Sequence, residues 1–253
     1  MRRTGLLVGL LLGLGGLASA AGAQETERSW SGYVEKGPQE TVGPEPGFTY
    51  VSATWIQPAV TCTERGARVA VWVGLDGDGT PTVEQAGTVA MCGSVGLPPL
   101  YYKAFWEMYD GPNSPGQEPF TVSPGDSIAA SVTYQASGSY LLVVKDLTSG
   151  SELSVTEECG AKETCQRGTA EWIVERNGGS TYPLADYDTV TFTNIVAETA
   201  GQIVASDLIT MVGTTGTTLS SCSLTSPIRR SEIDLPEIVF PFVSVICDWQ
   251  AAQ

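Results

Sequence analysis

The chain has 253 residues, a formal net charge of −15 and no histidine, with 28 acidic against 13 basic side chains. The absence of histidine excludes Ser-His-Asp and Cys-His catalysis and every metal site that needs an imidazole. The acidic balance argues against nucleic acid and anionic lipid surfaces as partners, because both carry negative charge. Any hydrolytic chemistry would therefore depend on carboxylates, with help from amide side chains.

Residues 1–23 have the pattern of a secretory signal peptide. Arg2 and Arg3 precede an apolar run that ends at Ala18 and is shorter than the roughly 20 residues of a membrane-spanning helix. Small residues follow, and cleavage after Ala23 would release residues 24–253. We therefore predict a secreted, extracellular protein with a single domain over residues 24–253 and no membrane partner.

The rest of the chain is predicted to be all-β. Short alternating segments rich in Val, Ile, Thr, Tyr and Trp are separated by Gly/Pro turns, and no amphipathic helix is evident. This pattern is typical of a β-sandwich. In chain order, the predicted strands are Phe48–Ile56, Arg68–Leu75, Leu100–Tyr109, Ser127–Tyr134, Tyr140–Asp146, Ala170–Arg176, Thr189–Ile195 and Ile238–Cys247.

Alternation along these strands predicts which side chains share a face of a sheet. In the strand that leads to Asp76, Trp72 and Asp76 alternate with core valines. In the strand that begins at Ala170, Glu171 and Glu175 lie opposite the core side chains. A concave sheet face that carries such polar and aromatic residues would form a groove.

Six cysteines follow the signal peptide. Their even number, an oxidising compartment and the absence of a C-x-x-C pair predict three disulfides rather than a zinc site. The sequence does not choose between the many possible pairings, although we favour Cys159–Cys165, which closes a short turn, and Cys222–Cys247. The other two cysteines are Cys62 and Cys92.

The composition also fits an acidic habitat. Few basic residues remain charged once the carboxylates are protonated, and self-repulsion is one of the forces that unfold proteins in acid.

Two strings carry the candidate chemistry, Thr82-Val-Glu-Gln85-Ala-Gly87 and Thr169-Ala-Glu171-Trp-Ile-Val-Glu-Arg176. Together with an ordered series of short motifs, they resemble the glutamic peptidase (eqolisin) family. The series is Trp30-Ser-Gly32, Tyr50-Val-Ser-Ala-Thr-Trp-Ile-Gln-Pro58, Val71-Trp-Val-Gly-Leu-Asp-Gly-Asp78, Tyr102-Lys-Ala-Phe-Trp-Glu-Met-Tyr109, Val122-Ser-Pro-Gly-Asp126, Pro183-Leu-Ala-Asp186 and Val190-Thr-Phe-Thr-Asn194.

The resemblance implies a sandwich of two large antiparallel sheets, of the jelly-roll or concanavalin-like kind, and an endopeptidase that acts in acid. It maps the catalytic pair onto Gln85 and Glu171. A carboxylate with an ordinary pKa of about 4.3 can be ionised in mild acid, take a proton from water and return it to the leaving nitrogen. The amide of Gln85 can orient the water and donate to the oxyanion. This mechanism needs no cofactor, and we expect a monomer that acts on proteins and peptides.

Four further residues are candidates for substrate binding: Trp72, Asp76, Trp106 and Glu107. Trp72 would contact the substrate, and Asp76 would supply supporting hydrogen bonds. The segment Asp76-Gly-Asp-Gly79 resembles the start of a calcium loop but lacks the later ligands, so we predict a turn and no metal site.

Two other functions fit a β-sandwich with a groove. A glycoside hydrolase would use two carboxylates, Glu107 with Glu171 or Glu171 with Glu175. A non-catalytic module would bind carbohydrate or protein on the same face. Gln85 separates these functions, because a glycosidase has no requirement for that amide.

Overall fold

The computed structural model describes residues 24–37, 47–110, 116–135, 138–160, 164–199, 201, 203, 205–225, 237–239 and 244–250. The predicted signal peptide lies outside these residues. The described residues form strands and contain no helix, so the all-β prediction is confirmed. The strands are β1 (Gln24–Glu27), β2 (Trp30–Lys36), β3 (Phe48–Ile56), β4 (Arg68–Leu75), β5 (Val83–Met91), β6 (Tyr101–Tyr109), β7 (Ser127–Tyr134), β8 (Ser139–Asp146), β9 (Glu152–Glu158), β10 (Thr169–Glu175), β11 (Thr189–Thr199), β12 (Ala205–Val212), β13 (Thr218–Leu224), β14 (Glu237–Val239) and β15 (Val245–Trp249).

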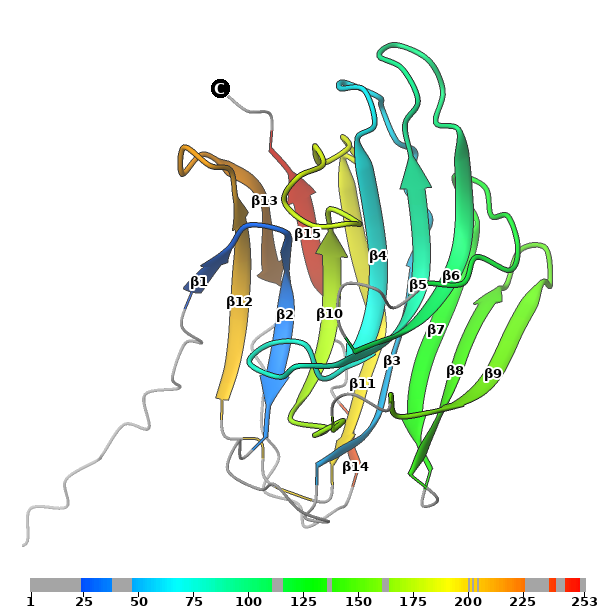
Figure 1. The fold of residues 1–253 in the computed structure, drawn as a ribbon, viewed down its shortest axis with the longest axis vertical. Helices are drawn as coiled ribbons and strands as arrows, with labels where there is room; N and C mark the ends of the chain where they lie inside the picture. Colours follow the sequence, from blue (N-terminus) through cyan, green and yellow to red (C-terminus); the bar gives the residue numbers. More distant parts are fainter. Residues whose placement is uncertain are drawn as a thin grey trace, which may run out of the picture.

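The strands follow one hydrogen-bonded order, β6-β5-β4-β10-β2-β12-β13-β15-β11-β3-β7-β8-β9. Neighbours along this path are antiparallel, whereas β1 is added in parallel to β12. The order folds back on itself, so that β4, β5, β6 and β10 contact β3, β7 and β8 (Figure 1). We call β6, β5, β4, β10, β2 and β12 the first layer, and β11, β3, β7, β8 and β9 the second layer. The predicted sandwich architecture is confirmed.

The main core lies between the two layers. It contains the alternate residues of β4 and β10 that the sequence placed there, with Trp172 and Leu75 fully buried against Trp55 and Leu142 of the second layer. A smaller apolar cluster covers the outer face of the first layer and includes Trp72 and Ile173. Because side chains cover both faces, β4 and β10 are buried almost without interruption.

All six cysteines are paired, as Cys62–Cys92, Cys159–Cys165 and Cys222–Cys247. The prediction of three disulfides and both favoured pairs are confirmed.

The predicted strand Ile238–Cys247 is corrected to two shorter strands, β14 and β15, which both pair with β11. Prediction also missed β1, β2, β5, β9, β12 and β13. The segment of β5, Val-Glu-Gln-Ala-Gly-Thr-Val-Ala-Met, lacks the alternation of apolar and polar residues that is typical of a strand with one solvent-exposed face. Its burial on both sides explains why.

Candidate active site

Glu171 and Gln85 lie in one row across the first layer, with Gly74 between them. Glu171 of β10 is in register with Gly74 of β4, and Gly74 is in register with Gln85 of β5. Residues in register point to the same face, and two strand spacings put these backbones about 10 Å apart. Because Gly74 has no side chain, nothing from that position separates the carboxyl group from the amide.

The carboxyl group of Glu171 is buried, with 1% of the residue exposed. Its Oε1 accepts hydrogen bonds from the backbone N–H of Asp78 and from Oγ1 of Thr169, both at 2.7 Å. Burial raises the pKa of Glu171 to about 8, although these two hydrogen bonds lower it. The pKa of Glu171 is therefore above the ordinary value of a carboxyl group.

Oε2 of Glu171 accepts no hydrogen bond from the residues that the structure describes. Gly77 lies directly beside it, and a Cβ atom at Gly77 would be only 2.6 Å from Oε2. The loop after β4 therefore approaches this oxygen so closely that position 77 has no room for a side chain.

Gln85 is held by Glu107 on the next strand. The two residues are in register between β5 and β6, and Nε2 of Gln85 donates to Oε2 of Glu107 at 3.2 Å. Burial raises the pKa of Glu107 to about 7. One amide hydrogen of Gln85 is thus engaged, which fixes the amide while its other hydrogen and its oxygen stay available to a ligand.

Trp72 lies one row further along the same face, and Glu175 lies two rows further. The indole Nε1 of Trp72 donates to Oε2 of Glu175 at 3.0 Å. Burial raises the pKa of Glu175 to about 7, and the Trp72 bond opposes this rise. The ring of Trp72 also lies against Gly74, where a Cβ atom would be 2.8 Å from Cζ3. Trp72 is therefore a wall of the space between Glu171 and Gln85.

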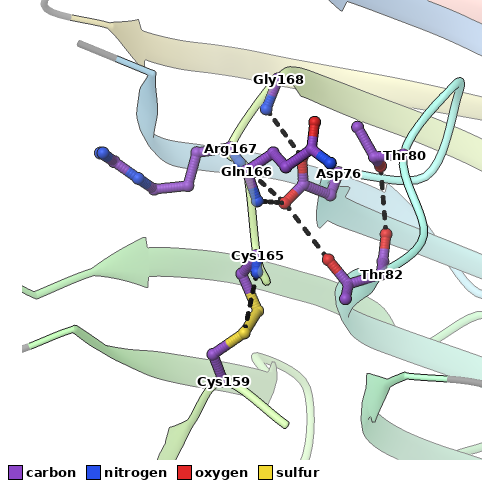
Figure 2. Close-up of a disulfide and its surroundings, with 8 residues drawn as sticks. All are labelled: Asp76, Thr80, Thr82, Cys159, Cys165, Gln166, Arg167 and Gly168. Carbon is purple, nitrogen blue, oxygen red and sulfur yellow. Dashed lines mark hydrogen bonds between the residues drawn. A yellow bond between two sulfur atoms is a disulfide. The ribbon is translucent and has the colours of Figure 1, made fainter. Parts of the chain in front are cut away.

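Asp76 supports the chain that leads into β10 (Figure 2). It is fully buried, and its carboxylate accepts the backbone N–H groups of Gln166, Arg167 and Gly168, each at 2.7 Å. The Cys159–Cys165 disulfide holds the same segment from its other end. This placement agrees with the supporting hydrogen bonds expected of Asp76.

Trp106 lies on the other face of the layer. It is in register with the core residue Ala86 and packs against the main core, whereas its neighbour Glu107 faces Gln85. Trp106 therefore lies on the face opposite to Gln85 and Glu171. A hollow of about 400 Å³ is formed on the second layer, by residues of β3 and β11 and the start of β7, and does not involve the Gln85–Glu171 row.

Two donors to Glu171 were not identified from the sequence. Thr169 stands in the string that marked Glu171, and its position two residues away on the strand is the signal that could have identified it. The N–H of Asp78 is a backbone group, so its role depends on the path of the loop and has no sequence signal. The loop itself is a turn, as predicted.

Comparison with known proteins identifies the family. A sequence model described as the peptidase A4 family matches residues 28–229. The chain belongs to the peptidase A4 family. It is therefore a glutamic endopeptidase, a hydrolase.

Its similarity to individual members is moderate in sequence and extensive in fold. It is 28% identical over 202 residues to aspergillopepsin-2 of Aspergillus niger. The aligned residues cover 72% of this chain and 68% of that protein. A crystal structure of aspergilloglutamic peptidase from A. niger matches with a TM-score of 0.56 at 26% identity, over 73% of this chain and 99% of the other. Scytalido-glutamic peptidase with a transition state analog inhibitor shares the fold, with a TM-score of 0.67 at 24% identity over 88% and 99% of the two chains.

Proposed function

We propose that this endopeptidase is exported and acts in acid, and that Gln85 and Glu171 hydrolyse the peptide bond. One observation carries the proposal: the carboxyl and amide groups flank Gly74 in a single row, in a chain without histidine. A carboxylate and an amide two strands apart can hold a water molecule and a peptide carbonyl between them.

In the proposed reaction, ionised Glu171 takes a proton from water at Oε2 while Oε1 is held by its two donors. The water oxygen attacks the carbonyl carbon, and the N–H of Gln85 that Glu107 does not engage donates to the oxyanion. Glu171 then returns the proton to the leaving nitrogen as the C–N bond breaks. Removal of one oxyanion donor typically costs about 2.7–4 kcal/mol, or roughly 100–1000-fold in rate.

The raised pKa of Glu171 sets a condition on this mechanism. A carboxyl group with a pKa of about 8 is mostly protonated in acid, and the protonated form cannot activate water. The reacting water must therefore bind at Oε2, where its hydrogen bond stabilises the ionised form and lowers the pKa. The protonated form is the one that the leaving nitrogen requires later in the cycle.

Support for action in acid comes from Glu107 and Glu175. Burial raises both pKa values to about 7, so both groups are neutral in acid and become negative above neutral pH. Negative charge beside Gln85 opposes the formation of an oxyanion. We therefore attribute the expected loss of activity at neutral pH to ionisation of these two carboxyl groups.

Export is supported by the sequence of residues 1–23 and by three disulfides, which persist in oxidising compartments. Among the described residues, no helix is long and apolar enough to cross a membrane. Peptide substrates are expected to lie over the face that carries Trp72, Gln85 and Glu171, in the groove predicted from the sequence.

The test is cleavage of a denatured protein by the purified chain between pH 2 and 8, beside Glu171→Gln and Gln85→Ala. Glu152→Gln, which removes an exposed carboxylate from β9, is the matched control. We expect cleavage by the wild type and the control below pH 7, and a loss of at least 100-fold in both site variants, because each supplies a separate part of the chemistry. Equal cleavage by the site variants, or a pH optimum above 7, would contradict the proposal.

A further inference from the structure

Lys36 joins the loop over Glu171 to the sheet. It is the last residue of β2, and its Nζ lies 2.6 Å from Oδ2 of Asp78 and 2.7 Å from Oδ2 of Asp207 on β12. All three side chains are largely buried, with 15%, 17% and 8% exposed. Burial lowers the pKa of Lys36, but the bonds to Asp207 and Asp78 outweigh it and raise this pKa above its ordinary value. Lys36 is therefore a permanent cation at this position.

The same lysine is linked to both donors that hold Glu171. Asp78, which its ammonium group binds, donates its backbone N–H to Oε1 of Glu171. Thr169, which donates its hydroxyl to the same oxygen, is in register with Lys36 between β10 and β2. Lys36 therefore contacts Asp78 through its side chain and lies beside Thr169 in the sheet.

Three carboxylates surround this position, since Glu25 lies 4.0 Å from the lysine Nζ in addition to Asp78 and Asp207. A cluster of this kind could hold a metal ion. Here the ammonium group already occupies the place between the oxygens, so the cluster is an ion-pair network that fixes the loop.

We propose that Lys36 is a positioning residue of the peptidase site. By holding Asp78, it keeps the backbone N–H of that residue on Oε1 of Glu171 and leaves Oε2 to the reacting water. This inference rests on the role of Glu171 in the proposed function. No part of Lys36 needs to touch the substrate, because its effect passes through the loop.

Loss of Lys36 has a defined electrostatic consequence. The charged groups around Glu171 are Asp76 and Asp78 from the loop, Glu84 from β5 and Lys36 from β2. Without the lysine, the charge of Asp78 is no longer neutralised and its loop is no longer held, so the N–H bond to Glu171 weakens. Both changes raise the pKa of Glu171, and the ionised base then forms only at higher pH.

The test compares Lys36→Met with Lys145→Met, which removes an exposed lysine paired with Glu152 on the outer strands. For Lys36→Met we expect kcat to fall about tenfold, the loss that follows from one weakened hydrogen bond. The KM should change less than twofold, and the acid limb of kcat/KM should move to higher pH. Lys36→Arg keeps the charge and should recover most of the rate, whereas Lys145→Met should match the wild type.

Asp78→Asn provides a second variant if Lys36→Met folds poorly. It removes the ion pair but keeps the backbone N–H, so kcat should fall as in Lys36→Met. The acid limb is not compared for this variant, because loss of the Asp78 charge itself lowers the pKa of Glu171. Near-UV circular dichroism establishes that each variant is folded.

Wild-type kcat and an unmoved pH profile in folded Lys36→Met would overturn the role of Lys36. Wild-type kcat in folded Asp78→Asn would also overturn it, as would an equal loss in Lys145→Met. Glu171→Gln in the same assay separates a failure of the proposed function from a failure of the proposed role of Lys36. If that variant cleaves as well as the wild type, the proposed function fails and the role of Lys36 falls with it. If Glu171→Gln is inactive while Lys36→Met has wild-type activity, only the proposed role of Lys36 fails.

Discussion

Gly77 offers a sharp test of how closely the loop after β4 fits Glu171. In Gly77→Ala, the new Cβ atom would lie 2.6 Å from Oε2 of Glu171, whereas ordinary contacts begin at 3.4 Å. The carboxyl group or the loop must therefore move by about 0.8 Å. A displacement of about 1 Å at a reacting group costs roughly 100-fold in rate, so we expect kcat to fall by about that factor.

The substitution also strains the backbone, because Gly77 has a φ of 129°. Gly125→Ala is the matched control: its φ is 91° and nothing lies within 4 Å of the added Cβ atom. Both variants should lose about 1–2 kcal/mol of unfolding free energy from a positive φ in alanine. Urea unfolding and steady-state kinetics measure the two effects separately. Full activity in folded Gly77→Ala, or an equal loss in Gly125→Ala, would refute the contact between the loop and Glu171.

Two further predictions concern stability. Asp76→Asn should lower the free energy of unfolding by about 3 kcal/mol or more, because three backbone N–H groups of residues 166–168 lose a charged acceptor. Asp126 accepts one exposed backbone N–H, so Asp126→Asn should cost much less, and equal losses in urea unfolding would argue against the role of Asp76. Stability should also fall as pH rises from about 4.5 to 8, because Glu107, Glu171 and Glu175 hold protons in the folded state at pH values where the unfolded chain has released them. Glu107 alone accounts for about 3 kcal/mol of this loss, so the free energy of unfolding of Glu107→Gln should fall by about 3 kcal/mol less over the same interval. A wild-type stability that is constant or rises over this interval would contradict the raised pKa values.

The fold was predictable where alternation or turn chemistry is strong. The bounds of β3, β4 and β7 agree with the sequence. The apolar residues of β3 and β7 face one core, and although β4 is buried on both faces, its core valines still alternate along the strand. β5 was missed because both of its faces are buried and its own residues show no two-residue period. The pairing of β14 and β15 with β11 depends on contacts between distant parts of the chain, which local sequence does not encode.

The site was predictable at the level of motifs and not at the level of environment. Gln85 and Glu171 were singled out by strings that resemble a peptidase family, and alternation placed Trp72 and Glu171 on the outer face. The raised pKa of Glu171 could not be predicted, because burial under the loop depends on tertiary structure. Trp106 was proposed as a substrate contact on its residue type, although its strand position, opposite in face to Glu107, already favoured the core.

The most direct test of the central claim is a kinetic double-mutant cycle on Gln85→Ala and Glu171→Gln, measured on a denatured protein substrate in acid. If the two side chains act as a unit on one water molecule and one carbonyl group, the double variant should be no slower than the slower single variant. Independent losses that multiply in the double variant, or substantial cleavage by folded Glu171→Gln alone, would contradict the Gln85–Glu171 mechanism.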